Sequence, residues 1–346
     1  MRILERIERI YAIGGGPGAN RVGGSQAEQD AHELVAGWLE EAGLSVEVDA
    51  AGNLLGRLLG DDPQAAEVWV GSHLDSVPNG GRFDGVLGVL AGLEAVERVG
   101  HSPRTLAVAA FRDEERGFTG SRARVQHGSL PELYVEAHIE QGPVLERASM
   151  PLGVATGIVG IARGEVVLQG AAGHAGTTPM DGRRDALCAA AELVLRVRDA
   201  AVAVSQGVAT VGRLEVVPGA ANVIPERAIV SVDARAPDRE RLDALVAAIG
   251  FAPSLLAEPT RMDERVQAVL REELERSGLP APELVSGAGH DAGVLAAAGV
   301  RCGMLFVRSG AGGVSHSPEE WSDPADVALC VDVLSAALER LARGSI

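Results

Sequence analysis

The feature that most restricts the fold of this chain is an alternation of short apolar runs with helix-like segments. Runs typical of β-strands lie at residues 54–59, 68–70, 105–111 and 133–139, and segment 86–99 carries its apolar residues at helical spacing. Strands that alternate with helices form a sheet with helices packed on it, so the pattern predicts an α/β fold. Ligands of such sheets bind at the carboxyl ends of the strands.

The pattern changes in the middle of the chain. Segment 153–261 combines several β-type runs with two helical segments, which indicates an antiparallel sheet covered on one face by two helices. The first pattern resumes after residue 262. The sequence therefore predicts one large domain made of residues 1–152 and 262–346, with a smaller α+β domain inserted between them.

Composition narrows the possible partners. The formal charge of −17 repels nucleic-acid phosphates and anionic lipids. The apolar runs are too short to span a bilayer, and the first ten residues lack the layout of a signal peptide. We therefore expect a cytoplasmic protein without nucleic-acid or membrane partners. The chain contains 31 arginines and no lysine, which excludes mechanisms that need a catalytic or phosphate-binding lysine.

Four short stretches place side chains of metal-ligand type after apolar runs or on loops. They are GSHLD with His73 and Asp75, followed by Asp84; RDEERG with Glu114 and Glu115; EAHIEQG with His138; and GGVSHSPEE with His316. His73 and Asp75 lie two residues apart and face the same side of an extended chain, so Asp75 can orient the imidazole. Adjacent carboxylates such as Glu114 and Glu115 repel each other unless cations neutralise them.

These side chains define the chemistry that we expect. Histidine nitrogens and carboxylate oxygens without thiolates suit zinc or manganese. We predict two divalent ions that share one carboxylate, with zinc as the first choice and manganese, cobalt or nickel as alternatives. Two such ions would lower the pKa of a shared water and make it a nucleophile. The three cysteines lack paired spacing and predict neither disulfides nor a thiolate zinc site.

Each motif alone also has a simpler interpretation. A histidine at the end of a strand is often only a hydrogen-bonded structural residue, and two adjacent glutamates often begin a solvated helix. The glycine-rich stretch 14–24 follows no strand, so we expect a mobile loop at the rim of the site and not a dinucleotide-binding loop. The four motifs together favour the metal site.

The chain resembles the N-carbamoyl-L-amino-acid hydrolases, allantoate amidohydrolases and β-ureidopropionases in six segments: GSHLDSVPNGGRFDG, DEERGF, EAHIEQGPVLE, GHAGTTPM, SGAGHDA and GGVSHSPEE. That family belongs to a superfamily of di-zinc aminoacylases and exopeptidases. The resemblance covers residues 14–320. It implies a mixed-sheet catalytic domain with an inserted α+β domain that serves as a lid and in dimerisation.

The resemblance also assigns the metal ligands. It places them in two groups that share one carboxylate: His73, Asp84 and His138 for one ion, and Asp84, Glu115 and His316 for the other. Glu114 would be the general base that takes a proton from the attacking water and gives it to the leaving nitrogen. Asp75 completes the implied catalytic group through its contact with His73.

Further positions match the family's substrate contacts. His174 is similar to a histidine that reaches across a dimer interface to stabilise the oxyanion, which predicts a homodimer formed through the inserted domain. Asn222 and Arg235 are similar to the pair that holds the substrate carboxylate. Gln141 and His290 are implied as additional substrate contacts.

Some of these assignments have open alternatives. Asp233 and Arg235 share one face of a predicted strand, so a local ion pair is the alternative to substrate binding by Arg235. His174 lies among glycines and is alternatively a plain turn residue. His290 and Asp291 could instead begin a helix near the metal ligands without touching a substrate.

The predicted activity is hydrolysis of the carbamoyl (ureido) C–N bond of an N-carbamoyl-L-amino acid or related ureido acid with a free carboxylate. The attacking group would be a hydroxide that bridges the two ions. Two alternatives stay open: an N-acyl-amino-acid or dipeptide hydrolase, and a non-catalytic binding protein that kept the fold. Only 22 residues separate Glu115 from His138, fewer than in the family, which predicts a reshaped pocket mouth.

Overall fold

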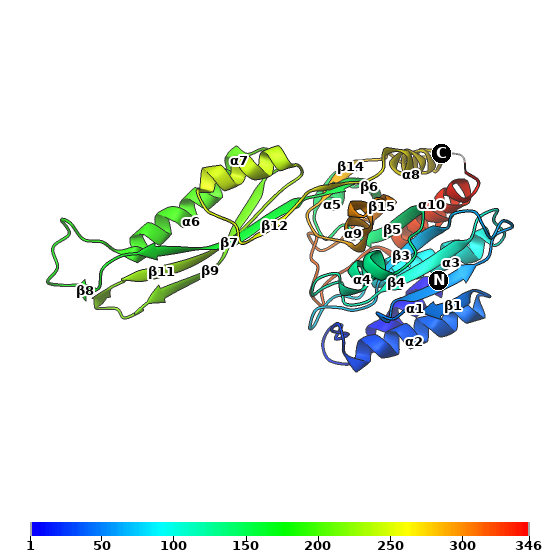
Figure 1. Cartoon of the computed structure of the whole chain (residues 1–346), viewed down its shortest axis with the longest axis horizontal. Coiled ribbons are helices and arrows are strands. Elements are labelled where there is room, and N and C mark those ends of the chain that lie inside the picture. The colour runs from blue at the N-terminus through cyan, green and yellow to red at the C-terminus, as the bar shows by residue number, and fades with distance from the viewer. Residues whose placement is uncertain (1, 345–346) are drawn as a thin grey trace. The chain divides into compact units, whose positions relative to one another are not determined.

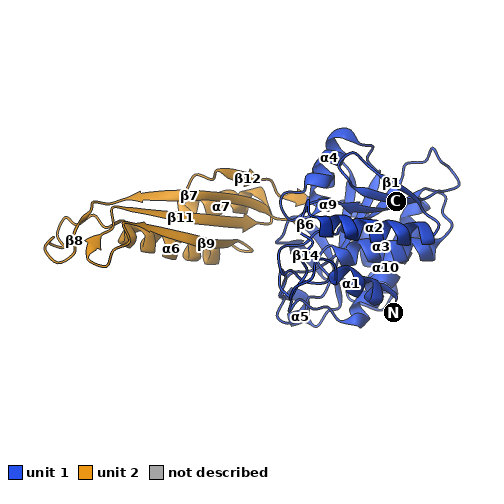
Figure 2. Cartoon of the chain, turned by 90° about the horizontal axis from the view of Figure 1, so that it is seen from below, with its two compact units in different colours: residues 1–157, 261–346 blue, residues 158–260 orange. Residues whose placement is uncertain are grey.

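The computed structural model describes residues 2–344 and divides the chain into two compact units (Figure 2). Unit 1 consists of two stretches, Met1–Gly157 and Arg261–Ile346, and unit 2 is the stretch between them, Ile158–Thr260. Each unit has its own apolar core. Within residues 2–344, no helix has the length and apolar character needed to cross a bilayer.

Unit 1 is built on a nine-stranded sheet in the order β1-β2-β4-β3-β5-β15-β6-β13, with β14 beside β6 (Figure 1). Its strands are β1 (Ser45–Val48), β2 (Leu54–Leu58), β3 (Val68–His73), β4 (Leu106–Phe111), β5 (Leu133–Ile139), β6 (Leu152–Ile158), β13 (Thr260–Arg261), β14 (Glu283–Ser286) and β15 (Arg301–Val307). Strands β4, β3, β5 and β15 are mutually parallel. They are apolar almost throughout because helices cover both faces of a parallel sheet.

Strand β6 belongs to this large sheet. It pairs antiparallel with β15, with Met304 opposite Ala155. The sequence analysis assigned residues from 153 onward to the inserted domain, whereas unit 2 begins at Ile158. The difference arises because an isolated apolar run carries no signal for the sheet in which it pairs.

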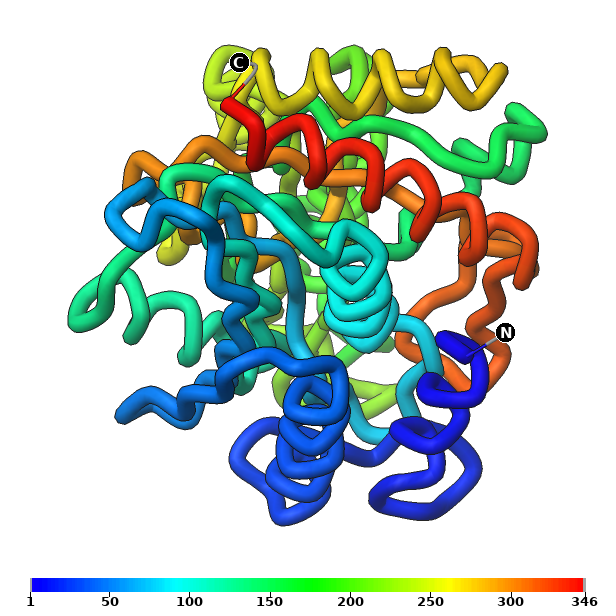
Figure 3. The backbone as a smooth tube through the Cα atoms, turned by 90° about the vertical axis from the view of Figure 1, so that its right-hand side faces the viewer, coloured from blue at the N-terminus to red at the C-terminus, as the bar shows by residue number. Residues whose placement is uncertain are grey.

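Eight helices of unit 1 pack around the sheet. They are α1 (Arg2–Tyr11), α2 (Gln26–Glu41), α3 (Val86–Val99), α4 (Thr119–His127), α5 (Val144–Ala148), α8 (Glu264–Arg276), α9 (Asp291–Ala297) and α10 (Pro324–Ala342). Side-chain oxygens of Ser25, Asp263 and Asp323 accept backbone N–H groups at the starts of α2, α8 and α10. Helix α10 lies against α3, as Figure 3 shows, and both pack on one face of the sheet.

The opposite face of the sheet carries the polar side chains. Alternate residues of β3 and β5 point to opposite faces, so Val70 and Val135 face the α3 side while His73 and His138 face α9. Gly71 pairs with Glu136, so His73 and His138, each two residues further on, reach the same level. The carboxyl ends of the parallel strands thus bring these two histidines together.

Unit 2 is an antiparallel sheet covered on one face by two helices. Its four-stranded sheet has the order β12-β7-β11-β9, and β8 and β10 form a separate pair. The elements are β7 (Gly160–Gln169), β8 (Gly173–His174), α6 (Ala186–Ala203), β9 (Val208–Val217), β10 (Val223–Ile224), β11 (Arg227–Ala236), α7 (Arg239–Ile249) and β12 (Leu255–Ala257). Every second residue of β11 is buried beneath α6 and α7, which leaves its alternate face uncovered.

Candidate metal centre

Asp84 lies at the centre of a cluster of histidines in unit 1. It follows β3 on the loop that leads into α3, and its residue surface is only 3% exposed. Its Oδ1 lies 3.5 Å from Nε2 of His73 and 3.3 Å from Nε2 of His138. Its Oδ2 lies 3.4 Å from Nε2 of His316. The two carboxylate oxygens of Asp84 therefore face different histidines, as a bridging ligand requires.

Glu115 completes the second side of the cluster. Its Oε2 lies 3.4 Å from Nε2 of His316, on the loop that precedes α10. The five predicted ligands thus form two groups that share Asp84, and within each group the candidate ligand atoms lie within 4.8 Å of one another. His316 is the most exposed member, with 49% of its side chain open to solvent.

The side chains of this cluster fit divalent ions. Nε2 of His138 and Oε1 of Glu115 are buried and have no hydrogen-bond partner, although buried polar atoms normally find one. The donor set contains only imidazole nitrogens and carboxylate oxygens, which are ligands of zinc and similar ions. Cations would satisfy the orphaned atoms and neutralise the clustered carboxylates.

Neighbouring groups fix which nitrogen of each buried histidine faces Asp84. Nδ1 of His138 lies 2.9 Å from the backbone oxygen of Ile139 and donates to it, which leaves Nε2 with a lone pair. Nδ1 of His73 lies 3.2 Å from Oδ1 of Asp75. In both cases the partner of Nδ1 favours the tautomer whose Nε2 can bind a cation.

Asp75 also holds the backbone of the two adjacent glutamates. Its Oδ1 accepts the N–H of Glu114 at 3.1 Å, and its Oδ2 accepts the N–H of Glu115 at 3.2 Å. Asp113, immediately before them, has a left-handed backbone with φ of 53°. Asp75 therefore orients His73 and the Glu114–Glu115 peptide together, which explains why a fully buried carboxylate occurs here.

The ionisation of these groups shows how strongly they depend on one another. Burial raises the pKa of Glu114 well above its usual value, and the nearby His73 offsets part of that effect. Burial would also raise the pKa of Asp84, but the three histidines that face its oxygens outweigh this effect and hold that pKa well below its usual value. Glu114 is therefore the carboxyl group of the cluster that most readily holds a proton. A general base must hold a proton after it has taken it from water and before it passes it on.

Gln141 and His290 lie next to the ligand cluster. Nε2 of Gln141 donates to Oδ2 of Asp84 at 2.8 Å, so its amide is directed at the shared carboxylate. The ring of His290 lies 4.5 Å from that of His138, and its Nε2 is 2.8 Å from Oγ of Ser286. Burial lowers the pKa of His290 well below its usual value, so the ring is neutral. Both side chains therefore lie in contact with members of the ligand cluster.

The other three predicted residues lie in unit 2. Strand pairing brings His174 opposite Val223, which places it beside Asn222. Nδ1 of His174 accepts the N–H of Gly176 at 3.1 Å, so Nε2 carries the proton and is a hydrogen-bond donor. Arg235 forms the ion pair that the sequence left open, with its Nε 2.9 Å from Oδ1 of Asp233.

That ion pair has a third member. Arg163 also donates to Asp233, through Nε at 2.9 Å and through an Nη at 2.6 Å. Two arginines thus share one carboxylate on the face of β11 that α6 and α7 leave uncovered. Asp233 thereby fixes the positions of both guanidinium groups.

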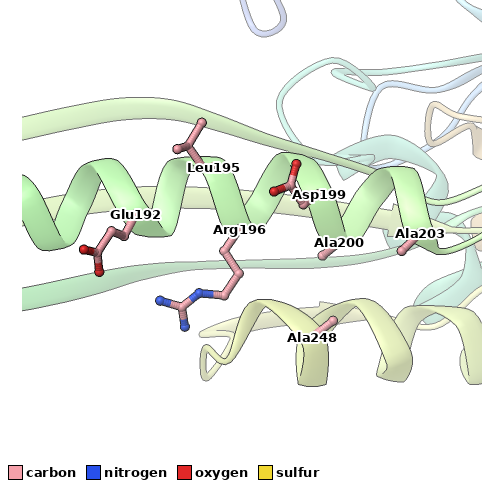
Figure 4. Close-up of a pocket in the computed structure, with 7 residues that line it drawn as sticks. All are labelled: Glu192, Leu195, Arg196, Asp199, Ala200, Ala203 and Ala248. Carbon is pink, nitrogen blue, oxygen red and sulfur yellow. The ribbon is translucent and has the colours of Figure 1, made fainter.

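Unit 2 also contains an open pocket between α6 and α7, with a volume of about 460 Å³ (Figure 4). It is lined by Glu192, Leu195, Arg196, Asp199, Ala200, Ala203 and Ala248. All of these residues belong to the two helices, whereas Arg235 and Asp233 lie on the uncovered face of the sheet. This pocket is therefore separate from the predicted substrate contacts.

Two residues of the site were missed by the sequence analysis. Arg21 is fully buried and donates to the backbone oxygen of Leu74, beside His73. Its loop, for which the sequence predicts mobility, makes paired backbone hydrogen bonds between Ala19 and Gly80. Glu320 is 2% exposed and accepts the backbone N–H of Asp84 at 3.1 Å. Glu320 belongs to the motif GGVSHSPEE, which the sequence analysis had already selected. Its closeness to His316 in the sequence was the signal that could have identified it.

Comparisons with known proteins agree with this geometry. The model of the peptidase family M20/M25/M40 matches residues 69–340. An N-carbamoyl-L-amino acid amidohydrolase of Geobacillus stearothermophilus is 39% identical over 99% of this chain and 98% of its own length. An allantoate deiminase of Arabidopsis thaliana is 31% identical over 86% of this chain and 73% of its own length.

A solved structure extends the similarity to the whole fold. A hydantoinase/carbamoylase family amidase from Burkholderia ambifaria is 30% identical, with a TM-score of 0.91 over 97% of this chain and 96% of the other. The alignment with the Geobacillus protein spans 409 positions against 346 residues here, so at least 63 positions are gaps in this chain. The predicted fold class is thus confirmed, in a shortened version.

Proposed function

We propose, from the premise that this chain belongs to the peptidase family M20/M25/M40, that it hydrolyses the ureido C–N bond of N-carbamoyl-L-amino acids or related ureido acids. The predictions of the family and of a hydrolase of linear amides are confirmed by the family match and by relatives that are named amidohydrolases. The observation that carries the proposal for this chain is Asp84, which faces histidines on both sides with Glu114 beside them.

The residues of the cluster are compatible with divalent metal ions. We propose two sets of ligands that share Asp84. His73, Asp84 and His138 would bind one ion, and Asp84, Glu115 and His316 would bind a second. Zinc is the proposed ion because the donors are imidazole and carboxylate. When bound, the ions would lower the pKa of a water and polarise the substrate carbonyl oxygen.

Glu114 is the proposed proton carrier. Its Oε2 lies 3.9 Å from Nε2 of His73, and it belongs to neither ligand group. It takes a proton from the attacking water as the new C–O bond forms at the ureido carbon. It then gives that proton to the substrate nitrogen as the C–N bond breaks. The products are the amino acid and carbamate, which decays to carbon dioxide and ammonia.

Residues of unit 2 are the proposed contacts for the remainder of the substrate. Arg235 and Asn222 would hold the substrate carboxylate, and Asp233, which accepts hydrogen bonds from Arg235 and Arg163, would keep the Arg235 guanidinium in place. His174 would donate from Nε2 to the carbonyl oxygen as negative charge develops on it, which is supported by the acceptor role of its Nδ1. Gln141 and His290 would contact the substrate from unit 1.

A homodimer through unit 2 is part of the proposal. Strand β9 is an edge strand ten residues long, and Val208 and Leu214 on it are 57% and 42% exposed. On the neighbouring helix α6, Leu195 and Val202 are 51% and 82% exposed. A long, exposed, apolar edge is normally covered in a soluble protein, and a second copy would cover it while supplying His174 to the other subunit.

The dimer proposal has a direct test. Replacing Val208 and Leu214 with lysine should give a monomer in light scattering, because charges on an edge strand oppose strand pairing. The monomer should keep its metal ions but lose activity. A fully active monomer would refute the shared role of His174.

For the location in the cell, we propose the cytoplasm, which is supported by the free thiols of Cys188, Cys302 and Cys330.

The activity is tested by supplying metal-loaded protein with matched substrates. N-carbamoyl and N-acetyl derivatives of the same amino acid are compared, and released ammonia and acetate are measured separately. The proposal expects ammonia in proportion to free amino acid. Acetate without ammonia would favour an N-acyl-amino-acid hydrolase. Absence of turnover with any divalent metal would favour a binding protein.

A further inference from the structure

Glu320 connects two loops that are far apart in the sequence. It lies between β15 and α10, and its Oε1 accepts the backbone N–H groups of Phe83 at 2.8 Å and Asp84 at 3.1 Å. Its Oε2 accepts the hydroxyl of Ser315 at 2.9 Å. One buried carboxylate therefore fixes the backbone of the shared ligand and the residue immediately before His316.

The surroundings are shaped around this side chain. A Cβ atom on Gly81 would lie 2.0 Å from the carboxyl carbon of Glu320, so any larger residue at position 81 would displace that carboxylate. His316 has a left-handed backbone with φ of 56°, a conformation that a single loop residue holds only when its neighbours restrain it. The hydrogen bond from Ser315 to Glu320 anchors the residue immediately before it.

We propose that Glu320 is a positioning residue that sets the spacing between Asp84 and His316, and thereby decides whether the second ligand group can hold its ion. The inference rests on the proposed metal-dependent function and deepens it. It concerns one group selectively, because His73 and His138 stand on the ends of neighbouring strands β3 and β5. Their spacing is set by the sheet.

Three side chains converge on the same oxygen of Asp84, which makes the spacing sensitive. Nε2 of Gln141 lies 2.8 Å, Oγ of Ser315 3.2 Å and Nε2 of His316 3.4 Å from Oδ2. Ser315 has only one hydroxyl proton, and Oγ is closer to Glu320 than to Asp84. With Glu320 present, the serine is directed toward Glu320, and Oδ2 of Asp84 keeps a lone pair for an ion.

The test uses Glu320→Ala, Glu320→Gln and a matched control, Glu319→Gln. Glu319 is the adjacent residue of the same type, but it is exposed, and its hydrogen bonds with Ser317 lie within its own loop. Metal-free protein is titrated with Zn²⁺ or Mn²⁺ by calorimetry, and bound metal is counted by elemental analysis. Melting of the metal-free proteins reports folding separately.

The expected result is selective. In Glu320→Ala, the ion of the group Asp84, Glu115 and His316 should lose about 10–100-fold in affinity, the range for removal of a residue that orients a metal ligand, while the other ion changes by less than about threefold. Glu320→Gln keeps an oxygen for the two N–H groups but turns an amide toward Ser315, so its loss should be smaller. Glu319→Gln should bind both ions as the original protein does.

The outcomes that overturn the inference are distinct from those that overturn the function. Wild-type affinities for both ions in Glu320→Ala would refute it, as would an equal loss of both. If the alanine variant fails to fold, the glutamine variant decides by the same criterion. An original protein that binds two ions without releasing ammonia would refute the proposed function and leave the inference to be judged on the titrations.

Discussion

The adjacent glutamates 114 and 115 allow base and ligand to be separated by one experiment. Glu114 belongs to neither ligand group, and its nearest approach to a ligand histidine is 3.9 Å, whereas Glu115 is a member of the group with Asp84 and His316. Both backbone N–H groups are held by Asp75, so either glutamine substitution should keep the local chain in place. The two variants are therefore each other's control.

The two variants should change different quantities: kcat in Glu114→Gln and metal content in Glu115→Gln. Glu114→Gln should lower kcat about 10²–10⁴-fold, the usual contribution of a general base, which corresponds to about 3–5.5 kcal/mol in the barrier. Its metal content should stay unchanged. Glu115→Gln should lose one ion, because a neutral amide replaces a charged ligand next to His316.

Stability gives a second readout for the same pair. Because burial raises the pKa of Glu114, ionising it at neutral pH destabilises the metal-free protein, and an uncharged glutamine removes that cost. The metal-free Glu114→Gln variant should therefore melt at the same temperature as the original protein or higher.

Activity is measured as ammonia release under saturating substrate, with metal content determined on the same samples. The reasoning is refuted if Glu114→Gln keeps more than about a tenth of kcat. It is equally refuted if that variant loses metal while Glu115→Gln does not, since the roles of the two residues would then be reversed.

Three further predictions follow from named contacts. Asp84→Asn should weaken both ions by more than about tenfold in calorimetric titrations, because Asp84 faces both groups; loss of one ion alone would contradict a shared ligand. The hydrogen bond with Asp84 raises the pKa of His316 to about 9 in the metal-free protein, so metal binding at pH 7.5 should release protons, that of His316 among them, and should weaken as the pH falls; titrations in buffers of different ionisation enthalpy would reveal no release if this is wrong. Gly88→Ala should destabilise the metal-free protein by about 1–3 kcal/mol in denaturant unfolding, because the new Cβ would lie 2.2 Å from the backbone oxygen of Ala137. Gly37→Ala is the control: position 37 has open space around it, so the substitution should stabilise helix α2 by about 0.5–1 kcal/mol.

Local patterns in the sequence predicted the parts of the site that stand on strand ends. His73 and His138 follow apolar runs that become β3 and β5, and parallel pairing brings the ends of such strands to one edge. The resemblance to a known family supplied the grouping of ligands around Asp84, which no spacing rule gives. The side of the sheet on which α9 packs was not predicted, because helical periodicity does not indicate the face of a sheet against which a helix lies.

The residues that were missed act over long sequence distances. Glu320 accepts a hydrogen bond from the N–H of Asp84, which lies 236 positions away in the sequence. Arg21 donates to the backbone oxygen of Leu74, which lies 53 positions away. Such contacts depend on how loops cross in space, and a single sequence carries no periodic signal for that. The same limit applies to β6, whose apolar run gave no indication that it pairs with β15 in the large sheet.

The position of β15 has a consequence for how the protein is made. This strand lies between β5 and β6 in the sheet, although more than 140 residues separate it from either along the chain. A ribosome will have released His73, Asp84, Glu115 and His138 long before residues 301–316 emerge. The complete sheet and the complete set of candidate ligands can therefore form only late in translation, after β15 and His316 have emerged.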